Sequence, residues 1–348
     1  MKKIIALLCS VLVLFGALSV SAAAMPYSEG LGALKTQFVQ GVGPETDDLT
    51  IDYLYFSPVK ENDTVEYPLV VWLHGMWDGS YIGRQVKNNG IGYWTSDEFQ
   101  SRFPAGGAFI MAPRSPEEQF IYWEDRTVYP LRAAIDDFIA QNKDNIDLSR
   151  IYIGGYSMGG RMTLKMITAY PDMFAAAFPI CPAWSPDEAS LELIKDMPIW
   201  LTCGENDTTV NFKGVAKTWN NICGASERND INRFSTMTVS SMPDGSPAPS
   251  GHESWQAVAH DMFSFECGDY PNMSTVDGNG NEVKLTYPDG MISWLSQFTS
   301  DFDGSAATDS GNIKPNWSGI CIDTFIRSLF GRMFVTLIKV IDRITDKF

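Results

Sequence analysis

Residues 151–160 constrain this chain more than any other part of its sequence. They begin as a β-branched and aromatic run that is typical of a buried strand, and they continue as Gly-Tyr-Ser-Met-Gly around Ser157. A helical pattern follows from Arg161 to Tyr170, and Pro171 ends it. The stretch therefore predicts a strand, a tight turn and a helix, with a serine at the turn.

A serine at such a turn projects from the top of the sheet, because the backbone is strained there and only small neighbours fit. Gly155 and Gly159 occupy the positions two residues before and after Ser157. The N-terminus of the following helix would point its positive end at whatever the hydroxyl attacks. This pattern indicates a nucleophilic serine, and a structural glycine-serine turn is the alternative reading.

Strand-like and helix-like segments alternate at short spacing through the middle of the chain. This alternation predicts an α/β fold with a mostly parallel sheet and helices on both faces. Strands are expected at residues 50–57, 67–74, 108–112, 174–180, 198–203 and 234–239, helices at 96–102, 131–141, 186–195, 211–221 and 291–298, and a hairpin over 273–285. Ligands bind such sheets at the carboxyl ends of the strands. Four candidate groups are expected there: His74, Ser157, Asp207 and His252.

The two ends of the chain differ from its middle. Residues 1–24 are typical of a secretory signal peptide, which predicts a secreted or cell-surface protein; a retained membrane anchor is the alternative. Residues 25–300 are expected to form the catalytic domain and 301–317 a linker. Residues 318–348 predict an amphipathic helix, which could dock on the domain, contact a membrane or cell surface, or self-associate.

Charge and cysteine content limit the binding partners, disulfides and metal ions that this chain can have. The net charge of −16 argues against nucleic acid, and no basic patch occurs. Removal of residues 1–24 leaves five of the six cysteines, an odd number, so at least one does not pair within the chain. Cys223 and Cys267 are the first pair to test, and Cys181 and Cys203 suit buried thiols. With three histidines and no Cys-x-x-Cys, the sequence predicts no metal and no cofactor.

The three histidines have different settings. His252 lies in a loop after the last expected parallel strand, and it is the predicted base for Ser157. His74 ends a strand just before Gly75, where we expect it to shape the loop at the oxyanion edge. His260 lies in a helical stretch and is interpreted as structural.

Asp207 is predicted to orient the base. A serine hydroxyl is a poor nucleophile unless a base takes its proton and a carboxylate holds that base. Asp207 follows a buried strand by four residues, although an Asx-type turn would also explain it, and Glu205 and Asp230 are lesser candidates. The order Ser157, Asp207, His252 is the order of the triad in α/β-hydrolases.

Acyl transfer also needs N–H donors aimed at the developing oxyanion. Met158 follows the serine and is predicted to supply one backbone amide, and Met76 in the loop after Gly75 to supply the other. Aromatic residues in loops at this edge could stack on a substrate, although loop packing would also explain them. The residues assigned to substrate binding are His74, Trp77, Trp184 and Trp255.

Together the motifs at residues 73–75, 155–160, 204–207 and 251–255 resemble the α/β-hydrolase superfamily. They are most similar to its branch of secreted feruloyl esterases, acetylxylan esterases and polyhydroxyalkanoate depolymerases, over roughly residues 50–300. Prolyl-oligopeptidase-like peptidases are similar as well. Many relatives carry a glycine-rich loop after His-Gly, where this chain has Met-Trp-Asp.

The resemblance implies an α/β-hydrolase fold and a secreted serine carboxylic ester hydrolase that works through an acyl-enzyme. Feruloyl or acetyl esters linked to plant cell-wall polysaccharide are the substrates it favours. A serine peptidase, a polyester depolymerase and a non-catalytic surface-binding protein on the same fold are the alternatives.

Overall fold

The computed structural model describes residues 38–86, 91–117, 121–239, 251–254, 273–284 and 290–308. The expected signal peptide and C-terminal helix lie outside these ranges, as do Trp255, His260 and Cys267. Within the described ranges, no helix has both the length and the apolar character needed to cross a membrane. Cys181, Cys203 and Cys223 are free thiols, and the pairing of Cys223 with Cys267 stays a prediction.

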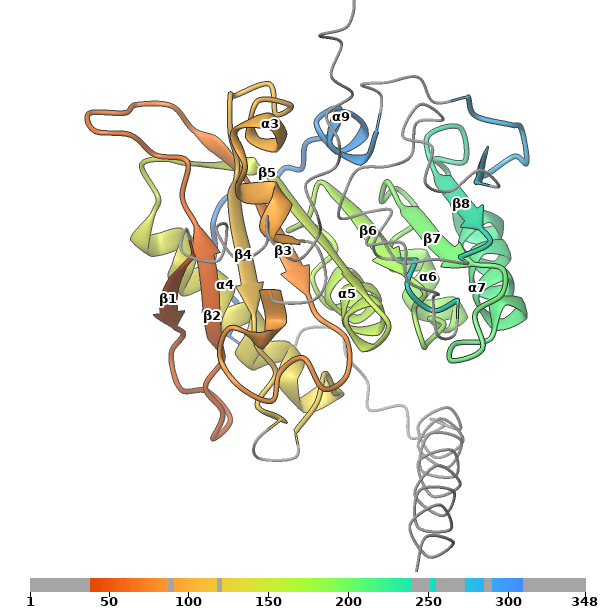
Figure 1. Cartoon of the computed structure of the whole chain (residues 1–348), viewed down its shortest axis with the longest axis horizontal. Helices are drawn as coiled ribbons and strands as arrows, with labels where there is room; N and C mark the ends of the chain where they lie inside the picture. Colours follow the sequence, from red (N-terminus) through yellow and green to blue (C-terminus); the bar gives the residue numbers. More distant parts are fainter. Residues whose placement is uncertain are drawn as a thin grey trace, which may run out of the picture.

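One nine-stranded sheet organises the described chain (Figure 1). Its spatial order is β1-β2-β4-β3-β5-β6-β7-β8-β9. The strands from β4 to β8 run parallel, and antiparallel pairs close both edges. The strands are β1 (Val39–Val42), β2 (Asp52–Phe56), β3 (Tyr67–Leu73), β4 (Phe109–Pro113), β5 (Ile146–Tyr156), β6 (Ala176–Ile180), β7 (Trp200–Gly204), β8 (Arg233–Met237) and β9 (Ser274–Asp277). The expected mostly parallel sheet is confirmed.

Helical segments connect these strands. The longer helices are α4 (Val128–Gln141), α5 (Met158–Ala169) and α7 (Phe212–Ala225). The shorter ones are η2 (Arg84–Val86), η3 (Ile91–Thr95), α3 (Asp97–Gln100), η5 (Asp125–Thr127), α6 (Glu188–Leu193) and α9 (Met291–Leu295). Side chains cap several of them; at α3 the Ser96 hydroxyl accepts the Phe99 N–H.

Helices cover both faces of the sheet, as expected. Phe138 of α4 packs edge-on against Phe109 of β4, which is in register with Leu69 of β3. Trp72 lies three residues beyond Leu69 and so points to the opposite face, where it meets Trp94 of η3. Every residue of β3 is buried, as a parallel strand with two covered faces requires.

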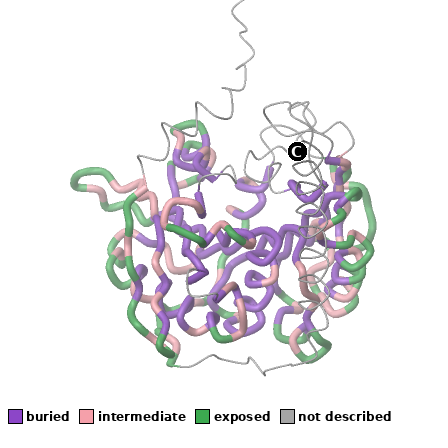
Figure 2. The backbone as a smooth tube through the Cα atoms, turned by 60° about the horizontal axis from the view of Figure 1, so that its bottom comes forward, coloured by how far each residue is buried: buried purple, intermediate pink, exposed green. Residues whose placement is uncertain are grey.

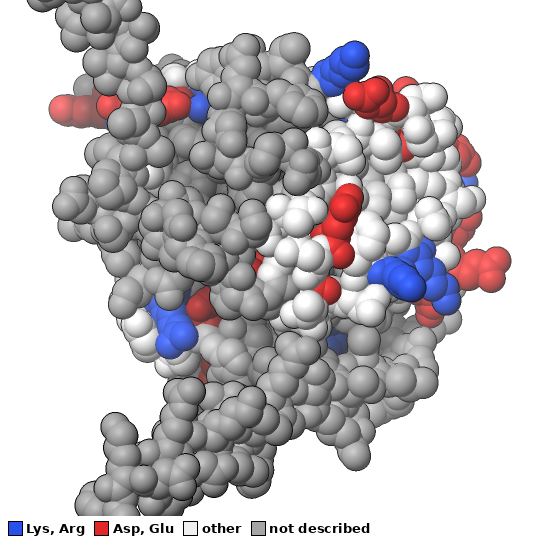
Figure 3. All heavy atoms as spheres, turned by 45° about the vertical axis from the view of Figure 1, so that its right-hand side comes forward, with Lys and Arg blue, Asp and Glu red and all other residues white. Residues whose placement is uncertain are grey.

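Buried residues run along the central strands, and exposed ones lie at the periphery (Figure 2). On the face of Figure 3, acidic and basic side chains are scattered among uncharged ones. Among the described residues visible there, charges of both signs are interspersed, which does not favour a polyanion.

Two elements differ from the sequence prediction. β1 was not expected; it pairs with β2 at an edge, although two of its valines, Val39 and Val42, are more than half exposed. The predicted 273–285 hairpin keeps its turn, and within the described residues a bridge between Val276 and Glu282 joins its two arms, but its first arm, β9, also pairs over four residues with β8.

Candidate active site

Ser157 sits in a strained turn between β5 and α5. Its backbone has φ 57° and ψ −115°, outside the regions that a residue with a Cβ normally adopts, at a cost of about 1–3 kcal/mol. The Ser157 N–H donates to Ile180 O at the end of β6, 2.9 Å away. The structure thus has the strand, turn and helix that the sequence predicted, and α5 begins directly after the serine.

The backbone of β3 runs against this turn. A Cβ on Gly155 would lie 2.3 Å from Leu73 O, and one on Gly159 would lie 2.1 Å from the same oxygen. Neither position can hold a side chain unless β3 moves. The requirement for small residues on both sides of the serine is confirmed.

Asp207 and His252 form a buried hydrogen-bonded pair. His252 Nδ1 lies 2.6 Å from Asp207 Oδ2. The other carboxylate oxygen accepts the N–H groups of Thr209 and Val210, each at 2.8 Å. With both carboxylate oxygens occupied, the Nδ1–H tautomer is held, and Nε2 is the acceptor nitrogen of the neutral ring.

The end of β6 links this pair to the serine. Cys181 follows Ile180, whose carbonyl holds the Ser157 amide, and the Cys181 thiol donates to His252 O at 3.8 Å. Asp207 reaches the same edge from the loop after β7. Residues that lie far apart in sequence therefore meet at the carboxyl ends of neighbouring strands, β5, β6 and β7.

Two opposing effects act on the pKa of His252. Burial raises the pKa of the Cys181 thiol, so this sulfur adds no negative charge beside His252 near pH 7. Burial of the ring lowers the pKa of His252, whereas its hydrogen bond to the Asp207 carboxylate raises it. This carboxylate stabilises an imidazolium, the state a base reaches after it accepts a proton.

Cys181, Asp207 and His252 are also the one group of potential metal ligands in the described residues, with ligand atoms within 4.8 Å of one another. The Asp207 and His252 atoms are already hydrogen-bonded at 2.6 Å, closer than two ligands of a tetrahedral zinc ion lie. The arrangement suits proton transfer better than metal binding.

His74 is buried completely, and its assignment to substrate binding stays a prediction. Its Nδ1 donates to Gly75 O at 2.6 Å, and its Nε2 accepts the Ser115 N–H at 3.1 Å. Burial lowers its pKa to about 4, so the ring is neutral. Trp123 Nε1 donates to His74 O. The side chain shapes the loop after β3, the role expected from its place before Gly75.

That loop carries the predicted second oxyanion donor, Met76, whose side chain is half-buried. The Tyr156 hydroxyl donates to the Asp78 carboxylate, and Arg84 lies 3.4 Å from that carboxylate. The first donor, Met158, is the first residue of α5. Both predicted donors therefore lie beside the serine turn.

The tryptophans assigned to substrate binding have separate environments. Trp77 is 41 % exposed on the loop after β3. Trp184 follows β6, and the Lys165 ammonium lies 4.5 Å from its ring centroid. Trp255 lies outside the described residues.

Glu117 and Tyr122 meet the loop after β3, although the sequence pattern points to neither. The Trp77 N–H donates to Glu117 Oε1 at 3.0 Å, and Tyr122 packs edge-on against the Trp77 ring. No local pattern marks either residue, because each contact joins segments about 40 residues apart or more.

Three comparisons bear on this site. A model of the phospholipase/carboxylesterase family matches residues 124–245, which include Ser157 and Asp207. A probable acetylxylan esterase A of Aspergillus flavus is 24 % identical over 176 residues, 50 % of this chain and 44 % of that protein. A probable carboxylesterase SOBER1-like of Arabidopsis thaliana is 25 % identical over 184 residues, 45 % of this chain and 66 % of that protein.

Among solved structures, that of a thermostable esterase superposes with a TM-score of 0.57 at 27 % identity. The match covers 77 % of this chain and 64 % of the esterase. This chain therefore spans less than two thirds of the length of these relatives, and less than half of the Aspergillus protein.

Proposed function

This chain belongs to the α/β-hydrolase superfamily, and we propose that it is a serine carboxylic ester hydrolase. The observation that carries the proposal is the buried hydrogen bond between Asp207 and His252, at the same sheet edge as the strained Ser157. A nucleophile, a base and an orienting carboxylate are the groups that acyl transfer needs.

In this mechanism, His252 Nε2 takes the Ser157 proton as the hydroxyl oxygen attacks the ester carbonyl carbon. Asp207 holds the ring and stabilises the imidazolium. The amides of Met158 and Met76 receive the oxyanion; in comparable sites the loss of one such donor costs about 2.7–4 kcal/mol of barrier. His252 then gives the proton to the leaving alcohol, and a water activated by the same ring releases the acid from the acyl-enzyme.

The proposed substrates are feruloyl or acetyl esters of cell-wall polysaccharide. The motifs resemble that branch of the superfamily, and the Aspergillus relative bears the name acetylxylan esterase. Residues 1–24 support export to such a substrate, and residues 318–348 offer a membrane or cell-surface contact. The mechanism needs no metal, and EDTA should leave the activity unchanged.

The test measures hydrolysis of p-nitrophenyl acetate, methyl ferulate, acetylated xylan, a short polyester and a prolyl peptide by the wild type and Ser157→Ala. We expect ester hydrolysis that falls by about 10⁴-fold or more in the variant. Equal rates in both proteins would contradict the proposal. Faster cleavage of the peptide than of any ester would assign a peptidase instead.

A further inference from the structure

Trp77 combines two features that are unfavourable in a folded protein. Its backbone lies in the left-handed region, with φ 75°, which costs free energy for any residue with a Cβ. Its indole is also 41 % exposed, so it gains little from burial. Stability alone would favour glycine at this position, and strain of this kind is characteristic of functional sites.

A second aromatic ring stands against the exposed indole. The Tyr122 and Trp77 ring centroids are 5.6 Å apart, with an angle of 86° between their planes. Tyr122 is half-buried beside Trp123, which binds the His74 carbonyl at the root of the same loop. The two rings form a right-angled corner on the loop that lies beside the serine turn.

The buried side chain of Glu117 fixes the backbone of Trp77 in this aromatic corner. Oε1 of this carboxyl group accepts the Trp77 N–H at 3.0 Å and the Ser115 hydroxyl at 3.3 Å. The contact fixes the amide of Trp77, the residue with the strained backbone, and so decides where its indole stands. Burial raises the pKa of Glu117 to about 7, which shows that placing a carboxyl group there is costly.

We propose that Trp77 and Tyr122 form a subsite for an uncharged substrate ring with an apolar face, and that Glu117 is the positioning residue that holds this subsite in place. An aromatic acyl group and the apolar face of a pyranose both satisfy this chemistry. Burial, followed by the nearby carboxyl groups of Glu117 and Glu124, raises the pKa of Tyr122, so this environment opposes a negative charge on a ring. An anionic ring is therefore disfavoured. The subsite rests on the proposed function, because it names the substrate class of that site.

The kinetic test compares methyl ferulate, acetylated methyl xyloside and methyl acetate as substrates. Trp77→Gly should raise KM for one of the two ring-bearing esters by about fivefold or more relative to KM for methyl acetate. Because glycine accepts the positive φ, the melting temperature should not fall. Glu117→Leu should reproduce the loss of ring selectivity, and Glu117→Gln, which keeps an acceptor oxygen, should retain most of it.

Tyr81→Ala is the matched control, because it removes another exposed aromatic ring, 48 % exposed, four residues further along the chain. If Trp77→Gly changes ring selectivity no more than Tyr81→Ala does, the subsite is refuted. Whichever ring-bearing ester responds identifies the ring as aromatic or pyranose.

Binding to an inactive protein separates the subsite from the chemistry. Titrations of methyl ferulate and xylobiose into Ser157→Ala, followed by calorimetry, should show binding of one ligand that weakens about fivefold or more in Ser157→Ala/Trp77→Gly. Equal binding by the two variants would overturn the subsite even if the wild type hydrolyses esters. Wild-type protein that hydrolyses no ester would overturn the proposed function, and this titration would still decide the subsite.

Discussion

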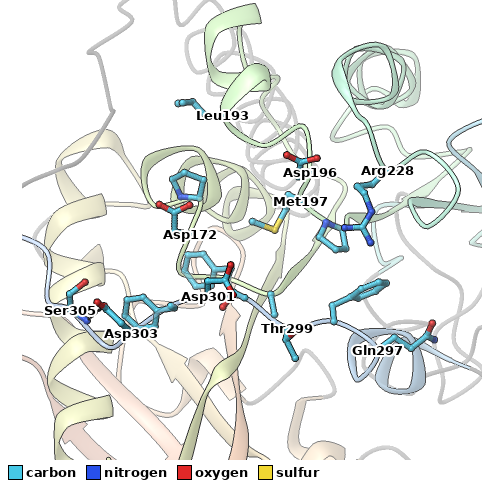
Figure 4. A pocket seen from close by; sticks show the side chains of 17 residues that line it. Asp172, Leu193, Asp196, Met197, Arg228, Gln297, Thr299, Asp301, Asp303 and Ser305 are labelled. Atoms are coloured by element: carbon cyan, nitrogen blue, oxygen red, sulfur yellow. Dashed lines mark hydrogen bonds between the residues drawn. The ribbon is translucent and has the colours of Figure 1, made fainter.

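The polar groups at the two ends of the parallel strands lie in opposite environments. At the carboxyl ends of the strands, the titratable side chains of His74, Glu117, Asp207 and His252 are buried and hydrogen-bonded. At the amino ends lies an open pocket of about 710 Å³, next to the segments that lead into β6, β7 and β8 (Figure 4). Its carboxylates, Asp172, Asp196, Asp301 and Asp303, are exposed.

The difference teaches that space alone does not make a reactive site. Water and salt screen exposed carboxylates, so the charges in the acidic pocket interact only weakly with nearby groups. Buried groups interact in a low dielectric, where one hydrogen bond sets a tautomer or shifts a pKa. The proposed reactive end of the strands is the one with the buried pair and the strained serine, although the pocket of about 710 Å³ lies at the opposite end.

The largest expected effect tests the buried pair. Asp207→Asn should lower kcat by about 10⁴-fold, because an amide cannot hold the Nδ1–H tautomer of His252. The measurement is steady-state hydrolysis of p-nitrophenyl acetate, with circular dichroism as the check on folding. A folded variant that keeps a tenth of the activity would give Asp207 a purely structural role.

The second prediction concerns His74 and pH. Its folded pKa of about 4 lies below the usual 6.5, so between these values the unfolded chain binds a proton that the folded protein does not. The stability is therefore complete above pH 6.5 and falls as the pH drops, by up to about 3 kcal/mol near pH 4.

Urea unfolding at pH 7 and pH 4.5, followed by tryptophan fluorescence, measures this loss. His74→Asn is the control: it should be less stable at pH 7 but lose less stability on acidification than the wild type. Identical losses in the two proteins would show that His74 does not cause the acid sensitivity.

A third, smaller effect separates the crowded turn from an open helix. Gly159→Ala should destabilise the protein by about 1–3 kcal/mol, because the added Cβ would lie 2.1 Å from Leu73 O. Gly214→Ala in α7 meets open space and should stabilise by about 0.5–1 kcal/mol. Melting temperatures of both variants decide the point, and a fall in both would mean that crowding is not the cause.

The smallest effect is expected at the acidic pocket. Asp172→Asn/Asp301→Asn removes two exposed charges and should leave kcat and KM within about twofold. The assay is the same ester hydrolysis at low and moderate salt. A large loss of activity would contradict this comparison of the two strand ends and would show that the pocket takes part in function.

The sequence by itself determined the elements that depend on local patterns. Continuous apolar runs marked the central strands, glycine spacing marked the serine turn, and the chain order placed Asp207 and His252 after neighbouring strands. These features were predictable because hydrophobic period and backbone strain act over a few residues.

Only the tertiary structure decided how β1 and β9 pair at the sheet edges and that His74 is completely buried. It also decided the hydrogen bond from the Trp77 N–H to Glu117. Each depends on contacts between distant segments or on which neighbour fills a space. Single residues in loops carry no periodic signal of such contacts, so only the folded chain shows them.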